Sequence, residues 1–230
     1  MQNNFTEFEN IIDVTFKDKG LLKQAFTHRS YLNENRSLTL SHNERLEFLG
    51  DAVLELSVTR YLYDQFPEKP EGELTALRSS LVNAITLSEV ASNIKVNDFL
   101  LLSKGEAKDT GRARQYILAN TLEAIIGAIY LDQGFEPAHG FISKFVLTLT
   151  DEIVRQGTWI DAKSSFQEKT QERMSTTPSY KKLKDTGPDH DKHFTVGVYL
   201  GDDLVAEGTG KSKQDAEQEA ARKALEKKGW

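Results

Sequence analysis

The chain has no cysteine and no long apolar run. The absence of cysteine excludes disulfide bonds and thiolate metal sites. No apolar stretch approaches the roughly 18 residues of a membrane-spanning helix, and residues 1–7 lack the basic-then-apolar order of a secretory signal peptide. The composition, with 38% hydrophobic and 28% charged residues, is ordinary for a soluble globular protein. We therefore expect a cytoplasmic protein that does not act at a membrane.

Two common catalytic patterns are also incomplete. Gly210-Lys211-Ser212 resembles the end of a phosphate-binding loop, but that motif needs a glycine where this chain has Val205. The five histidines show neither the H-E-x-x-H spacing nor another metal-binding spacing. The sequence therefore favours neither an ATPase nor a histidine-based metal site.

Taken alone, the net charge of −6 argues against a nucleic-acid partner. The charge is unevenly distributed, however. Residues 160–230 hold 13 basic and 13 acidic side chains, so all of the excess negative charge lies in residues 1–159. Clustered bases can still bind RNA while the acids hold cations, so net charge leaves nucleic-acid binding open.

The chain changes character near residue 158. Residues 1–155 carry apolar residues at helical spacing, with a break at 66–72 and an exposed loop expected at 104–111. We therefore predict an all-α domain over residues 1–157.

The second region predicts the order α-β-β-β-α. A helix over about 162–174 precedes three short extended stretches, of which 194–200 alternates as a half-buried strand should. Gly201-Asp202-Asp203 suits a hairpin turn, and an Ala-rich helix follows from Ser212. We assign a small α+β domain to residues 160–229.

An acidic stripe is predicted on the helix that a capping-box pattern, Ser41-x-x-Glu44, would open. Its acids fall within about 80° of helix surface, opposite an apolar stripe that we expect to pack. The acids are Glu44, Glu47, Asp51 and Glu55, and the apolar residues are Leu46, Leu49, Val53 and Leu56. A solvated acidic face is the simplest explanation. Two observations argue against it: stacked like charges destabilise a helix, with Arg45 the only cation in reach, and Gly50 in mid-helix indicates that something approaches closely.

A second helix, over residues 117–131, is apolar nearly all round and is predicted to be buried. Its main polar interruptions, Asn120 and Glu123, lie one turn apart. A carboxylate in such a helix is costly unless it is paired or coordinated. A buried arginine could pair with Glu123. The alternative is a cation shared with the acidic stripe, and oxygen-only ligands suit Mg²⁺ or Mn²⁺.

The segment His42–Leu54 (HNERLEFLGDAVL) resembles the signature of the ribonuclease III family. Thr27–Ser30 and Glu123–Asp132 match further segments of that family, and the similarity covers both domains in order. The resemblance implies an all-α endonuclease domain followed by a double-stranded-RNA-binding domain, acting as a homodimer.

The resemblance also implies roles for individual residues of the first domain. Glu47, Asp51, Asn120 and Glu123 would hold Mg²⁺, for which Mn²⁺ can substitute. Asp51 and Glu123 would be catalytic, with Glu44 and Glu71 as further acids near the cleft. The family usually has aspartate where this chain has Asn120. Phe48 matches an aromatic residue that inserts into the partner subunit, and ordinary core packing is its alternative role.

In the second domain, the resemblance implies that five side chains contact the RNA duplex: Lys163, Gln167, His190, Lys211 and Lys213. Such a domain spans two successive minor grooves and the phosphates between them. Lys211 and Lys213 flank Ser212, the expected N-cap, so their charge adds to the positive end of the helix dipole. Gln214 departs from the family pattern, which has a second consecutive base there, so we expect weaker phosphate binding.

We therefore expect a Mg²⁺-dependent endonuclease that cuts double-stranded RNA to 5′-phosphate and 3′-hydroxyl ends, with ribosomal RNA precursors among its substrates. One alternative is a binding-only protein whose site is impaired because Asn120 lacks a charge. Another is a helical scaffold whose acids merely cover its surface, which the position of Glu123 disfavours.

Overall fold

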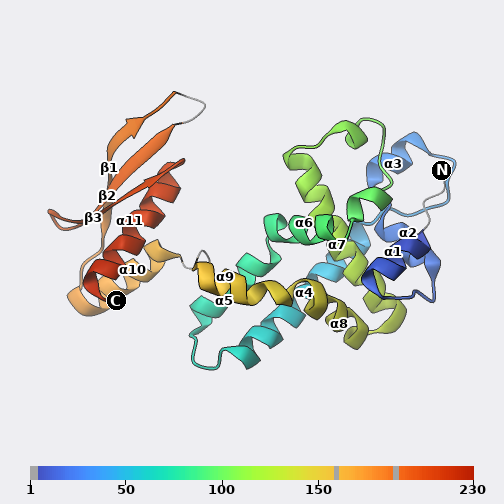
Figure 1. The fold of residues 1–230 in the computed structure, drawn as a ribbon, viewed down its shortest axis with the longest axis horizontal. Helices are drawn as coiled ribbons and strands as arrows, with labels where there is room; N and C mark the ends of the chain where they lie inside the picture. The colour runs from blue at the N-terminus through green and yellow to red at the C-terminus, as the bar shows by residue number, and fades with distance from the viewer. Residues whose placement is uncertain (1–4, 158–160, 189–191) are drawn as a thin grey trace. The chain divides into compact units, whose positions relative to one another are not determined.

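The computed structural model describes residues 5–157, 161–188 and 192–230, which fold as two compact units, 1–159 and 160–230 (Figure 1). The first is all-helical and the second has the order α-β-β-β-α. The predicted fold class is therefore confirmed.

Nine α-helices and three 3₁₀ turns make up the described part of the first unit. The helices are α1 (Phe5–Ile12), α2 (Lys19–Ala25), α3 (Arg29–Glu34), α4 (Glu44–Gln65), α5 (Glu71–Val82), α6 (Ala84–Asn93), α7 (Arg112–Gln133), α8 (Phe135–Phe145) and α9 (Thr150–Gln156). The turns are η1 (Val96–Phe99), η2 (Glu106–Lys108) and η3 (Leu147–Leu149). The expected loop at 104–111 therefore contains a helical turn, η2.

Helix α7 runs through the middle of this unit (Figure 1). Its residues from Ile117 to Ile129 are buried on nearly every side, as the apolar sequence predicts. Helix α4 packs along it, and α2, α6 and α8 also contact it. Burial of this much apolar surface is the main term that stabilises the unit.

The backbones of α4 and α7 approach each other at two glycines. A Cβ atom on Gly50 would lie 1.7 Å from the carbonyl oxygen of Glu123, and one on Gly127 would lie 2.2 Å from the carbonyl oxygen of Leu46. No side chain fits at either position. The close approach inferred from the mid-helix Gly50 is therefore confirmed, and α7 is its cause.

Two local predictions for α4 are wrong. The helix does not open on a Ser41 capping box. It begins at Glu44 after Asn43, whose main-chain N–H donates to the Thr27 carbonyl at 2.9 Å and so fixes where the chain enters the helix. Leu56 does not pack in the core either, since it is 59% exposed. The buried arc of α4 runs through Leu54 and Val58 instead.

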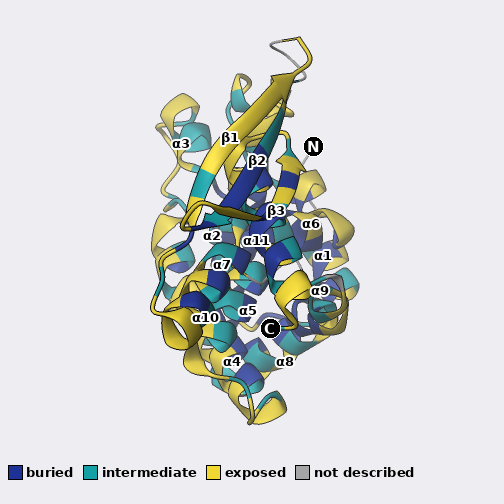
Figure 2. Cartoon of the chain, turned by 90° about the vertical axis from the view of Figure 1, so that its left-hand side faces the viewer, coloured by how far each residue is buried: buried dark blue, intermediate teal, exposed yellow. Residues whose placement is uncertain are grey.

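The second unit is a three-stranded antiparallel sheet, in the order β1-β2-β3, with two helices on one face. Its elements are α10 (Ala162–Met174), β1 (Ser179–Thr186), β2 (His193–Leu200), β3 (Asp203–Gly210) and α11 (Lys213–Lys228). Much of the central strand β2 is buried, whereas β1 is largely exposed (Figure 2). Phe166 and Val198 anchor the core between sheet and helices, and Gly201 turns the hairpin with φ +61°.

Replacement of Gly127 by alanine should destabilise the protein by about 3 kcal/mol or more, because the new methyl group meets backbone that cannot move aside cheaply. Gly140→Ala is the matched control, since a Cβ on this exposed glycine of α8 has no atom within 4 Å. The control should be neutral or stabilising by up to about 1 kcal/mol through helix propensity. Chemical denaturation of both variants measures the difference, and equal stabilities would refute the close packing.

Candidate active site

The crossing of α4 and α7 brings Glu123 of α7 against the acidic stripe of α4. Burial, together with the negative charges of Asp51, Glu47 and Glu55, raises the pKa of Glu123 to about 8. No lysine, arginine or histidine forms an ion pair with Glu123 in the described residues. The buried-arginine alternative is therefore not what the structure shows.

Glu47 lies close to Glu44, Asp51 and Asn120. Burial raises the pKa of Glu47, the neighbouring charge of Glu44 raises it further, and a hydrogen bond from the Asn120 side chain opposes both effects. The Asn120 amide therefore donates to a carboxylate of the cluster, a contact that an unprotonated aspartate at this position could not make.

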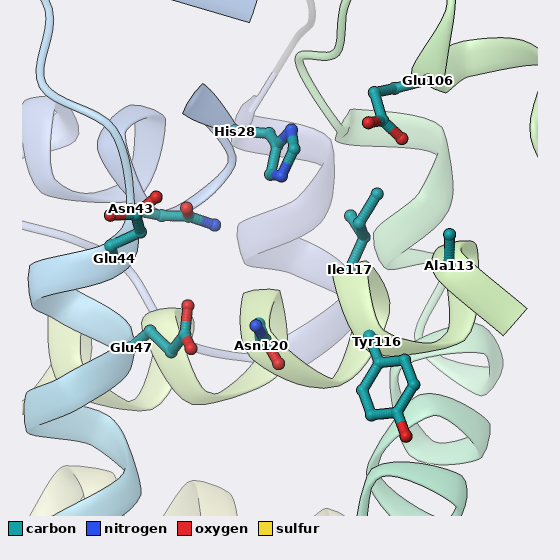
Figure 3. Close-up of a pocket in the computed structure, with 9 residues that line it drawn as sticks. All are labelled: His28, Asn43, Glu44, Glu47, Glu106, Ala113, Tyr116, Ile117 and Asn120. Carbon is teal, nitrogen blue, oxygen red and sulfur yellow. The ribbon is translucent and has the colours of Figure 1, made fainter. Parts of the chain in front are cut away.

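A cavity of about 420 Å³ opens beside these acids, between the start of α4 and the first half of α7 (Figure 3). Glu44, Glu47 and Asn120 line it, and Asp51 and Glu123 are not among its lining residues. The remaining lining residues are His28, Asn43, Glu106, Ala113, Tyr116 and Ile117. Burial lowers the pKa of His28, although the charges of Glu106 and Glu44 act in the opposite direction.

The other predicted acids lie at the edge of this arrangement. The Glu44 carboxylate lies 3.3 Å from Arg29 and 3.7 Å from the His42 ring, so the expectation that only Arg45 offers a nearby cation is wrong. Arg29 belongs to the family segment Thr27–Ser30, which precedes α4 in the sequence. Glu71 is exposed at the first position of α5 and does not line the cavity.

The donor chemistry of the cluster fits a hard cation. Glu47, Asp51, Glu123 and the Asn120 carbonyl offer oxygen ligands only, which is the set that Mg²⁺ and Mn²⁺ prefer. Within the described residues, no three histidine or carboxylate side chains are already arranged as a metal-binding group. A cation would therefore have to draw the carboxylates together, and it would relieve the repulsion that raises the Glu123 pKa.

Helix α4 also presents an apolar stripe to solvent. Phe48 is 81% exposed, and Tyr63 and Leu56 lie exposed on the same side of the helix. Core packing, the alternative role for Phe48, is therefore excluded within this chain. Large exposed aromatic and aliphatic side chains in one row are typical of a surface that another protein covers.

In the second unit, the predicted RNA-contacting residues differ in their surroundings. Lys211 and Lys213 are exposed on either side of Ser212, which caps α11 in a capping box with Asp215. Gln167 lines an open groove on α10. The Lys163 ammonium instead lies 2.6 Å from the Glu217 carboxylate and 5.0 Å from the centre of the Tyr180 ring. His190 lies outside the described residues.

Sequence reasoning gave no role to His28, Glu106 or Tyr116, although all three line the cavity. The match of Thr27–Ser30 to a family segment was a signal for His28. Glu106 and Tyr116 offered none, because a loop residue and an aromatic at the start of a helix are common in any protein.

Comparison with known proteins gives two domain matches. A model described as Ribonuclease-III-like matches residues 18–149, and a double-stranded RNA binding motif matches residues 162–228. Ribonuclease 3 of Pelotomaculum thermopropionicum is 46% identical over 226 residues, which are 98% of this chain and 94% of that protein. Ribonuclease 3 of Carboxydothermus hydrogenoformans is likewise 46% identical over 226 residues, covering 98% and 96%.

A solved structure is similar to the first unit. It is the nuclease domain of ribonuclease III from Campylobacter jejuni, described as flexible in a region involved in dimer formation. It is 41% identical, with a TM-score of 0.58, and the match covers 63% of this chain and 97% of that one. Separately, none of the helices in the described residues is long and apolar enough to cross a membrane.

The raised pKa of Glu123 predicts how the stability of the metal-free protein depends on pH. Well below pH 4.5 the Glu123 carboxyl is protonated in both the folded and the unfolded protein, so its ionisation does not affect the free energy of unfolding. The folded protein loses stability as pH rises from 4.5 towards about 8. Glu123→Gln should therefore match the wild type in acid and exceed its unfolding temperature increasingly up to about pH 8. Thermal unfolding in EDTA measures this, with Glu68→Gln as an exposed control. A difference that does not change with pH would contradict it.

Proposed function

The chain belongs to the ribonuclease III family, and on that basis we propose that it is an endoribonuclease that hydrolyses phosphodiester bonds in double-stranded RNA. Its products carry 5′-phosphate and 3′-hydroxyl ends, and precursors of ribosomal RNA and other structured transcripts are its substrates. The observation that supports this most directly is Glu123, a half-buried acid that faces other acids with no paired base in the described residues.

The active site requires a divalent cation, for which we propose Mg²⁺ with Mn²⁺ as a substitute. Glu47, Asp51, Glu123 and the Asn120 side-chain oxygen would hold it. When bound, such an ion supplies a water of lowered pKa and neutralises charge on the scissile phosphate. Asp51 and Glu123 are the essential acids of the reaction. Glu44, held by Arg29, and Glu71 act at the edge of the cleft.

The second unit holds the duplex. Lys211 and Lys213 bring positive charge to the N-terminus of α11, where main-chain N–H groups also face outward. Gln167 and His190 would contact the two minor grooves that flank the phosphates bound there. Lys163 contributes only after it leaves Glu217, because its charge is otherwise neutralised at 2.6 Å.

The protein acts as a homodimer through the exposed stripe of α4. Phe48 inserts into the partner subunit, and Leu56 and Tyr63 extend the same apolar row. The Campylobacter jejuni relative, which is described as forming a dimer, supports this assembly. Two clefts, one from each subunit, would cut the two strands and leave short 3′ overhangs.

A binding-only protein is the alternative, because Asn120 carries no charge. We favour the enzyme, since three carboxylates remain and an amide oxygen is an accepted ligand of hard cations. The curated relatives that match nearly the whole chain are ribonucleases, which supports the same choice.

Glu123→Gln should abolish cleavage and leave duplex binding intact, because the carboxylate serves the metal while the second unit holds the RNA. Long duplex RNA incubated with and without Mg²⁺ measures cleavage and product ends, and gel-shift titration in EDTA measures binding. Glu136→Gln removes an exposed carboxylate of α8 and serves as the control. Near-normal cleavage by Glu123→Gln in saturating Mg²⁺ would show that the site is misassigned.

Asn120→Asp should lower the Mg²⁺ concentration needed for half-maximal cleavage, with little change in the rate at saturation. The added charge strengthens cation binding, and the hydrogen bond that now occupies Glu47 is lost. Initial rates measured against Mg²⁺ and Mn²⁺ concentration for both proteins decide it. A wild type that stays inert at every concentration, while the variant cleaves, would establish the binding-only alternative.

A further inference from the structure

His28 forms part of the cavity wall, and its side chain is held in a defined way. It is the N-cap of α3, and its ring nitrogen Nδ1 accepts a hydrogen bond from the main-chain N–H of Ser30 at 3.3 Å. The Ser30 hydroxyl oxygen lies 2.8 Å from the same nitrogen and itself accepts from the main-chain N–H of Ser103 at 3.1 Å. The Ser30 proton is therefore directed at His28.

These contacts fix the position of the imidazole proton. A main-chain N–H can only donate, so Nδ1 must present its lone pair and the ring proton must lie on Nε2. Within the part of the chain that the structure describes, no hydrogen bond occupies Nε2. The ring lies at the cavity, with Glu106 on one side and Asn43 and Glu44 on the other (Figure 3). His28 therefore offers one N–H donor to whatever enters.

The hydrogen-bonded pair of Ser30 and Ser103 also positions Glu106, which lies opposite His28 at the cavity. The main-chain N–H of Glu106 donates to the Ser103 hydroxyl at 3.2 Å, and Arg114 donates to the Glu106 carbonyl oxygen at 2.6 Å. The Glu106 carboxylate has no ion-pair partner in the described residues, whereas Glu44 is paired with Arg29. Beside His28, the cavity therefore combines a fixed N–H donor with the free carboxylate of Glu106, and Glu47 is a second lining carboxylate without an ion pair in the described residues.

This combination selects the group that can bind. A phosphate oxygen would accept from His28 but would be repelled by Glu44, Glu47 and Glu106. A hydroxyl group accepts and donates at once, so it satisfies both sides. In the interior of a nucleic acid strand only the ribose 2′-hydroxyl has this property, and it is the group that distinguishes RNA from DNA.

We propose that this cavity binds the ribose of one nucleotide of the strand being cut, and that His28 and Glu106 together recognise its 2′-hydroxyl. Nε2–H of His28 donates to the hydroxyl oxygen, and the hydroxyl proton is donated to the Glu106 carboxylate. The inference rests on the proposed function, since it places a substrate nucleotide beside Glu47 and Asn120. It makes the catalytic unit itself, and not only the second unit, selective for RNA.

The test combines a substrate change with a protein change. RNA duplexes carry a single 2′-deoxynucleotide at each position near the cut, and kcat/KM is measured in saturating Mg²⁺ for wild type and His28→Asn. Asparagine is a good N-cap residue but is too short to carry a donor into the cavity. One deoxy position should lower wild-type kcat/KM about three- to ten-fold, the value of one hydrogen bond. The same position should have a clearly smaller effect in His28→Asn, since only the bond to Glu106 is then left.

Glu106→Ala provides a second variant that leaves the α3 cap intact, and it should reduce the same deoxy effect because alanine offers the hydroxyl proton no acceptor. Glu136→Gln should retain it in full, and thermal unfolding confirms that each variant is folded. If the deoxy effect is equal in wild type, His28→Asn and Glu106→Ala, or if no position shows one in wild type, the inference is wrong. If the wild type cleaves no RNA duplex at all, the proposed function fails and the inference fails with it.

Discussion

The backbones of α4 and α7 pack against each other with no side chain between them, and the candidate site depends on that contact. Gly50 and Gly127 allow it, since a methyl group at either position would overlap a carbonyl oxygen of the opposite helix. The oxygen facing Gly50 belongs to Glu123, so the same contact that closes the core also fixes the main chain of Glu123 beside α4. Main-chain contact therefore sets how closely α7 approaches α4, and the rotamers of Glu123 and Asp51 set the remaining distance between their carboxylates.

In this arrangement, the burial of apolar surface stabilises the fold while repulsion among the carboxylates destabilises it. The apolar sides of α7 bury enough surface to hold Glu123 in place, and the acid repels Asp51 and Glu47 while no cation is bound. Compared with an aspartate, Asn120 lowers that repulsion because it adds no negative charge. Its side chain also donates a hydrogen bond to Glu47, which stabilises the charged form of that carboxylate. A fourth carboxylate would bind metal more strongly and would destabilise the metal-free fold. In the proposed metal site, the residue at this position would balance cation affinity against stability without metal.

The sequence predicted the features that depend on periodicity or composition and missed those that depend on distant contacts. The buried α7, the close approach at Gly50 and the α-β-β-β-α order all follow from local patterns. The start of α4 was misplaced because a main-chain bond from Asn43 to Thr27, which no pattern reports, fixes it. Leu56 was misassigned because helical periodicity identifies an apolar side but not whether the same chain covers it. The cavity wall at Glu106 depends on a hydrogen bond between residues 30 and 103.

The ion pair between Lys163 and Glu217 would change how RNA binding at Lys163 depends on salt concentration. A free surface lysine that meets a phosphate releases a condensed counterion to the solution, which makes binding sensitive to salt. Lys163 already holds a counterion that is part of the protein, 2.6 Å away and unable to diffuse off. A phosphate that reaches Lys163 exchanges one anion for another and leaves Glu217 behind without its partner. Under the proposed role of Lys163, a phosphate that reaches it would still free a counterion condensed on the RNA, but the Glu217 carboxylate left unpaired would offset part of that gain.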